Sequence, residues 1–176
     1  YEVLTNLSST KNNIILDFNY TASTRLILKQ CGLSDEDIDN RLIKVHGEAS
    51  NNDIIFGVED NAGIKKEHVF LRKAYNIKYK ALNFSELYDR IKSVAIFGHS
   101  LGETDHTYFN KLFQESCMYN KFSTNNNKEF WLFYYKENGY HCMMQQLDSL
   151  THNSLTSFRQ YNRVNFINTD KEKVFI

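Results

Sequence analysis

The feature that most constrains the fold is an alternation of short apolar runs with helical segments. Ile14–Phe18 is an apolar run of strand length, and Ser23–Gln30 follows it as a helical segment with hydroxyl residues at its start. The same order returns at Ser93–Phe97, which leads through a glycine-rich turn into apolar residues at helical spacing. Because strands that alternate with helices form helix-covered parallel sheets, the pattern predicts an α/β three-layer sandwich with a mainly parallel, Rossmann-like sheet.

The remaining elements are predicted in the same way. The strands expected in one sheet are 14–18, 42–46, 54–58 and 93–97, and further strands are predicted at 130–135 and 164–167. Helices are predicted at 69–75, at 84–91, from Thr104 onward and at 140–150, whereas Ser34–Asp37 is predicted as an acidic connection. A length of 176 residues predicts a single α/β domain.

Charge and hydropathy exclude several classes of protein. The 21 basic and 21 acidic residues give a net charge of zero, which argues against a nucleic-acid partner and against an anionic membrane surface. No apolar stretch approaches the roughly 20 residues of a spanning helix, so no membrane partner is expected. Cys31, Cys117 and Cys142 are widely spaced, which argues against a zinc ribbon and a disulfide framework. We therefore expect a cytoplasmic protein without a metal.

Polar residues follow three of the predicted strands. Asn19 comes after the first strand, His46 and Gly47 after the second, and Gly98–Gly102 after the strand at 93–97. Because ligands of parallel sheets bind beyond the carboxyl ends of the strands, these residues are expected to share one pocket. Each also has an ordinary structural explanation: Asn19 as a helix cap, His46 as a loop residue.

Gly98–Gly102 has two chemical interpretations. Its sequence, Gly-His-Ser-Leu-Gly, satisfies the nucleophile elbow of α/β-hydrolases, with Ser100 as the nucleophile. A glycine turn before a helix also suits a phosphate group. The later histidines, His141 and His152, offer no convincing acid–histidine pair, so a nucleotide loop is favoured. His99, like His141 and His152, is interpreted as an ordinary surface or packing histidine.

Four motifs in order resemble one family. Asp17–Thr21, Lys44–Glu48, Ile54–Val58 and Phe97–Gly102 with the nearby Asp105 are similar to the AbiH family of bacterial phage abortive-infection proteins. The resemblance covers about residues 13–110. It implies a role in phage defence, with a phage-derived trigger as a partner.

AbiH proteins in turn resemble sirtuin-like NAD-consuming defence domains. By that resemblance, Asn19 and His46 correspond to the catalytic asparagine and histidine, and NAD is the nucleotide substrate. The residues expected to contact the nucleotide are Tyr20, Gly47, Gly98, Ser100, Leu101 and Asp105. The zinc module of deacetylating sirtuins is absent, so protein deacylation is not expected. The Gly-Asn-Gly-Phe-Asp stretch that opens AbiH proteins is also absent, so the chain is expected to be the carboxyl-terminal part of a longer protein.

The implied reaction is cleavage of the nicotinamide–ribose bond. His46 would act as general base, and Asn19 would orient the water or the carboxamide. Two alternatives stay open: a serine hydrolase that uses Ser100, and a non-catalytic nucleotide-sensing or interaction domain. A homo-oligomer is also left open.

Overall fold

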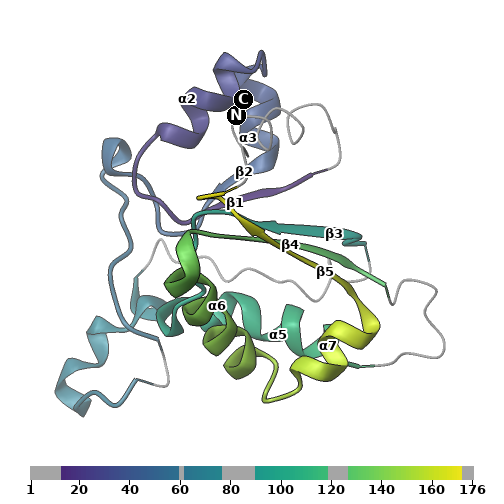
Figure 1. Cartoon of the computed structure of the whole chain (residues 1–176). Helices are drawn as coiled ribbons and strands as arrows, with labels where there is room; N and C mark the ends of the chain where they lie inside the picture. Colours follow the sequence, from purple (N-terminus) through teal and green to yellow (C-terminus); the bar gives the residue numbers. More distant parts are fainter. Residues whose placement is uncertain (1–12, 60–61, 77–89, 119–126, 172–176) are drawn as a thin grey trace. The chain divides into compact units, whose positions relative to one another are not determined.

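The computed structural model describes residues 13–59, 62–76, 90–118 and 127–171. These residues fall into two compact units, unit 1 (described residues 13–76) and unit 2 (described residues 90–171). Each unit has its own open parallel sheet (Figure 1). The predicted α/β class with parallel strands is confirmed. That the whole chain forms a single domain stays a prediction.

Unit 1 is built on two short strands and two helices. Its elements are β1 (Ile15–Asp17), α2 (Ser23–Gln30), α3 (Asp35–Arg41) and β2 (Leu42–Lys44). The strands are parallel, and Asp17 lies opposite Lys44 at their carboxyl ends. The two strands therefore end at the same level. The buried apolar residues of this unit are Leu28, Ile38, Val45 and Ile55.

Helix α3 corrects the prediction of an acidic connection. The Ser34 side chain accepts a hydrogen bond from the backbone N–H of Asp37 at 3.1 Å and caps the helix. The acidic residues that follow lie in the first turn, where the helix dipole favours negative charge. The acidic run therefore begins a helix.

The predicted strand at 54–58 and helix at 69–75 are also wrong. Within the described residues, 54–58 forms only an isolated bridge between Val58 and Arg72. The predicted helix is two 3₁₀ segments, η2 (Lys66–Leu71) and η3 (Lys73–Tyr75). The Lys73 N–H donates to the Val58 carbonyl at 2.9 Å rather than to a carbonyl of the preceding turn. This hydrogen bond interrupts the predicted helix at Lys73. A shorter 3₁₀ turn, η1 (Ala49–Asn51), follows β2.

Unit 2 is a three-stranded parallel sheet with the order β3-β4-β5. Its elements are β3 (Ser93–Ile96), η4 (Glu103–Asp105), α5 (His106–Ser116), β4 (Glu129–Tyr134), α6 (Lys136–Leu150), α7 (Leu155–Tyr161) and β5 (Arg163–Asn168). Because crossovers between parallel strands are nearly always right-handed, and the strand order advances in one direction, both connections should lie on one face. Figure 1 shows α5, α6 and α7 together on one face of this sheet.

These elements confirm the predicted strands at 93–97, 130–135 and 164–167. Helix α6 begins four residues before the predicted Tyr140, and α7 was not predicted. The prediction of one sheet is wrong for the residues that the structure describes, because β1 and β2 form one sheet while β3 pairs with β4 in another. The predicted helix at 84–91 lies mostly outside the described residues.

The core of unit 2 contains a cluster of phenylalanine rings. Phe113 from α5, Phe130 from β4 and Phe158 from α7 are fully buried. Their ring centroids lie 4.8 Å apart for Phe130 and Phe158, and 5.6 Å apart for Phe113 and Phe130. Edge-to-face and offset ring pairs of this kind add to the free energy gained by burial. Among the described helices, none has the length and apolar character needed to cross a membrane.

Candidate functional site

In unit 1, aromatic residues gather around a histidine beyond the ends of β1 and β2. Phe18 and Tyr20 follow β1, and His46 follows β2. The Tyr20 ring stacks on the His46 imidazole with centroids 5.9 Å apart, and Phe18 meets the same imidazole edge-on at 5.5 Å. His46 is only 5% exposed. The structure therefore brings a buried histidine and two aromatic rings together at the predicted strand ends.

An ion pair fixes the turn that carries Asn19. Lys44 Nζ lies 2.9 Å from Asp17 Oδ2 and donates to the Thr21 carbonyl at 2.7 Å. The other Asp17 oxygen, Oδ1, accepts the backbone N–H of Asn19 at 2.9 Å. Asp17 is buried and Asn19 is exposed. The Asn19 backbone is thus anchored while its side chain faces solvent.

The turn after β2 requires glycine. Gly47 has φ +74°, and a Cβ at this position would lie 2.1 Å from the Asp53 carbonyl oxygen. Asp53 Oδ1 also accepts the backbone N–H of Glu48 at 2.6 Å. The next residue, Ala49, donates its N–H to the Tyr20 carbonyl at 2.8 Å. The two turns that carry Tyr20 and His46 are therefore tied to each other.

In unit 2, a histidine closes the loop after β3. His99 Nδ1 accepts the backbone N–H of Leu101 at 2.9 Å, and His99 Nε2 lies 3.3 Å from Asp105 Oδ2. His106 Nε2 lies 3.0 Å from the Leu101 carbonyl oxygen, which it can bond as a donor. Gly98 and Leu101 both have positive φ, +65° and +55°. Since Nδ1 is an acceptor, neutral His99 carries its proton on Nε2, where it can donate to Asp105.

His99 is the residue that the sequence interpretation missed. Its ring bonds Leu101 on one side and Asp105 on the other, so it organises the loop. Leu101 is fully buried and its N–H is already engaged. Asp105 faces His99. The signal available in the sequence was a histidine inside a glycine turn with an acid at the start of the next helix.

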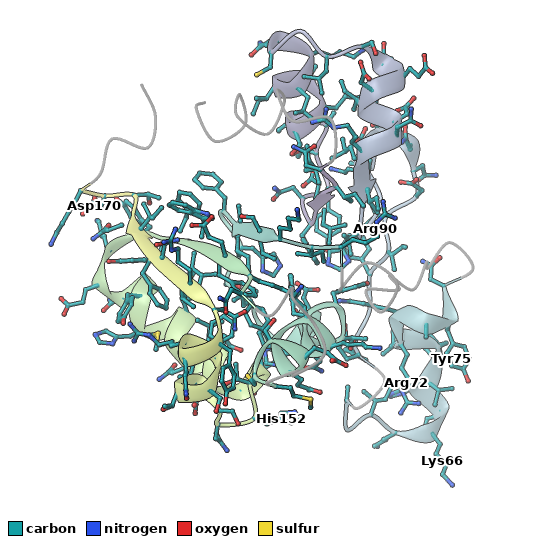
Figure 2. The ribbon with its side chains drawn as sticks, turned by 90° about the vertical axis from the view of Figure 1, so that its right-hand side faces the viewer. Lys66, Arg72, Tyr75, Arg90, His152 and Asp170 are labelled. Atoms are coloured by element: carbon teal, nitrogen blue, oxygen red, sulfur yellow. The ribbon has the colours of Figure 1, made fainter. Side chains whose placement is uncertain are left out.

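The nucleophile-elbow interpretation stays a prediction, although His99, His141 and His152 have partners other than Ser100. Ser100 is exposed. Both ring nitrogens of His99 have partners close in sequence, the Leu101 N–H and the Asp105 carboxylate. His152 Nε2 lies 3.1 Å from Gln114 Nε2, and Figure 2 shows His152 at the turn between α6 and α7. His141 lies beside Glu137 on the exposed side of α6.

The eight predicted site residues divide between the units. Unit 1 contains Asn19, Tyr20, His46 and Gly47, and unit 2 contains Gly98, Ser100, Leu101 and Asp105. One pocket shared by all eight stays a prediction. In the residues that the structure describes, no group of three or more His, Cys, Asp or Glu side chains could hold a metal ion.

The fold and these loops define an α/β protein with polar and aromatic residues beyond the carboxyl ends of parallel strands. A family model described as bacteriophage abortive infection AbiH matches residues 2–135. The chain therefore belongs to the AbiH family, and the resemblance seen in its motifs is confirmed. Neither the curated proteins nor the solved structures contain a match.

Proposed function

We propose that this AbiH protein acts in phage defence by hydrolysing the nicotinamide–ribose bond of NAD. The observation that supports it best is the stacking of Tyr20 on buried His46, next to the anchored turn of Asn19. The proposed reaction needs a general base, a positioned water and a bound nicotinamide ring. His46, Asn19 and Tyr20, which lie beyond two parallel strand ends, suit these three roles. Family membership supports the role in abortive infection.

His46 is the proposed general base. Water attacks the anomeric carbon of the ribose, the carbon–nitrogen bond to nicotinamide breaks, and the proton of the water passes to His46. The products are nicotinamide and ADP-ribose. Phe18 and Tyr20 contact the imidazole and fix its plane, which limits the orientations that it can take.

Asn19 is the proposed orienting residue. Its side chain offers one donor group and one acceptor, so it can hold the water or the carboxamide of nicotinamide. Its backbone is fixed by Asp17, and the residue itself is exposed. In unit 2, the proposal assigns nucleotide contacts to Gly98 and Ser100 on the family resemblance alone.

The test is nicotinamide release and NAD loss with the full-length protein. His46→Ala and Asn19→Ala should each slow turnover by ~10²–10⁴-fold, because each removes a group that acts in the transition state. Ser100→Ala should weaken binding and keep turnover at high NAD concentration. His68→Ala is the control, because His68 is an exposed histidine of the same unit.

Two results would contradict the proposal. An inactive Ser100→Ala together with an active Asn19→Ala would favour the serine hydrolase. Tight NAD binding without nicotinamide release in the intact, triggered protein would favour a nucleotide sensor.

A further inference from the structure

Phe56 is a large aromatic side chain held in solvent next to the proposed site. It is 71% exposed, although its ring centroid lies only 5.4 Å from that of Tyr20. Tyr20 is 37% exposed and stacks in turn on His46. The three rings therefore form a row that runs from the buried imidazole to a ring open to solvent.

The backbone on both sides of Phe56 is fixed. Ile55 is buried, and its N–H donates to the His46 carbonyl at 2.9 Å. On the other side, a Cβ at Gly57 would lie 2.5 Å from the Leu71 carbonyl oxygen, so this residue is packed closely against neighbouring backbone. Phe56 is thus presented from a constrained segment. An exposed ring on such a segment is typical of ligand-binding surfaces, because little ordering is needed when a flat ligand stacks on it.

We propose that Phe56, supported from behind by Tyr20, forms a stacking platform for the pyridinium ring of a nicotinamide nucleotide. This rests on the proposed function, which places the bond to be broken beside His46. The pyridinium of NAD is planar and cationic, and aromatic faces attract cations in addition to stacking on planar rings. Adenine is planar but neutral, so the platform favours the nicotinamide end of the dinucleotide.

The platform predicts a ring-selective loss of affinity. In calorimetry with the full-length protein, Phe56→Ala should weaken binding of nicotinamide mononucleotide by ~10- to 100-fold, the range that base–aromatic stacking gives. Binding of AMP should stay unchanged. Phe56→Trp should keep the affinity, whereas Phe56→Leu should lose it, because leucine restores apolar area without an aromatic face.

Phe70→Ala is the matched control. Phe70 is an exposed phenylalanine of the same unit at 64% exposure, and its ring partner is His68 rather than Tyr20. This variant should bind both nucleotides like the wild type. An equal loss of affinity in Phe70→Ala and Phe56→Ala would overturn the platform, because exposed apolar area alone would then explain both.

Other outcomes also overturn it. These are wild-type affinity of Phe56→Ala for nicotinamide mononucleotide, a loss of AMP binding in its place, or no binding of nicotinamide mononucleotide to the wild type. Failure of the proposed function can be told apart from failure of the platform. In that case, binding of nicotinamide mononucleotide would still depend on Phe56, but the protein would release no nicotinamide from NAD.

Discussion

The two units are stabilised by different interactions. Unit 2 rests on the fully buried rings of Phe113, Phe130 and Phe158 between its helices and sheet. Unit 1 has few buried apolar residues and relies more on charged pairs. These pairs include Asp17 with Lys44, Glu59 with Lys73, and Arg25 with Asp35 and Asp39.

The two units therefore differ both in what stabilises them and in whether they carry the proposed catalytic residues. Hydrophobic burial stabilises without specifying polar geometry, whereas a buried ion pair stabilises only if its partners stay in place. His46 and the anchored turn of Asn19 lie in the unit that depends on such pairs. Binding sites are often drawn from the less stable part of a protein. The four predictions below test whether the two units differ in this way, beginning with the largest effect.

Phe113→Ala should cause the largest loss of stability, ~3–5 kcal/mol in the free energy of unfolding. The ring is fully buried and contacts two other phenylalanines, so its removal leaves a cavity. Urea unfolding measures the change, with exposed Met118→Ala as the control in the same unit. A loss no larger than that of the control would show that the aromatic cluster does not stabilise unit 2.

Lys44→Met should destabilise unit 1 by ~3 kcal/mol, because it leaves the Asp17 carboxylate buried without its cation. Adding Asp17→Asn should recover most of the loss, since the amide is neutral and can still accept the Asn19 N–H. Thermal or urea unfolding of the single and double variants measures this. A double variant as unstable as Lys44→Met would show that charge burial is not the cause.

Two glycines with positive φ, one in each unit, should respond differently to alanine. Gly98→Ala should cost ~1 kcal/mol from backbone strain alone, because no atom of the described residues, apart from its two chain neighbours, lies within 4 Å of the added Cβ. Gly47→Ala should cost ~2–3 kcal/mol, since strain is joined by a clash with the Asp53 backbone. Equal unfolding midpoints for the two variants would contradict the steric argument.

Asp35 should give the smallest effect, a dependence of stability on pH. The hydrogen bond from Lys29 lowers the pKa of Asp35 below its ordinary value of 3.8. The stabilisation is therefore present above that ordinary value and is lost as the pH falls through the lowered pKa. The carboxylate is exposed, so salt should weaken the effect. Melting temperatures of wild type and Asp35→Asn between neutral and acidic pH measure it, and identical pH profiles would rule it out.

Strands were predictable where an apolar run of strand length lay between turn residues. This holds for β1, β2, β3 and β4, because a short apolar run between turn residues has few alternatives to a strand. The segment 54–58 has the same local pattern, but its pairing depends on the backbone of 71–73, which the local sequence does not reveal. Helix α3 was missed although the capping residue Ser34 signalled it.

The candidate site was predictable in part for the same reason. Placing Asn19 and His46 beyond two strands needs only the strand pattern and the parallel arrangement. The bonds of His99 to Leu101 and Asp105 depend on the positive φ of two loop residues, which sets where the ring points. The row of His46, Tyr20 and Phe56 depends on the backbone bond between Ile55 and His46. Neither arrangement follows from residue order.

The strand order has a consequence for synthesis on the ribosome. Every pair of neighbouring strands that the structure describes joins strands consecutive in the chain. Each of these pairings therefore closes a modest loop, and each of these described strands can pair as soon as the next one has been translated. The β1–β2 pair, with the buried salt bridge at its end, can form while unit 2 is still being made.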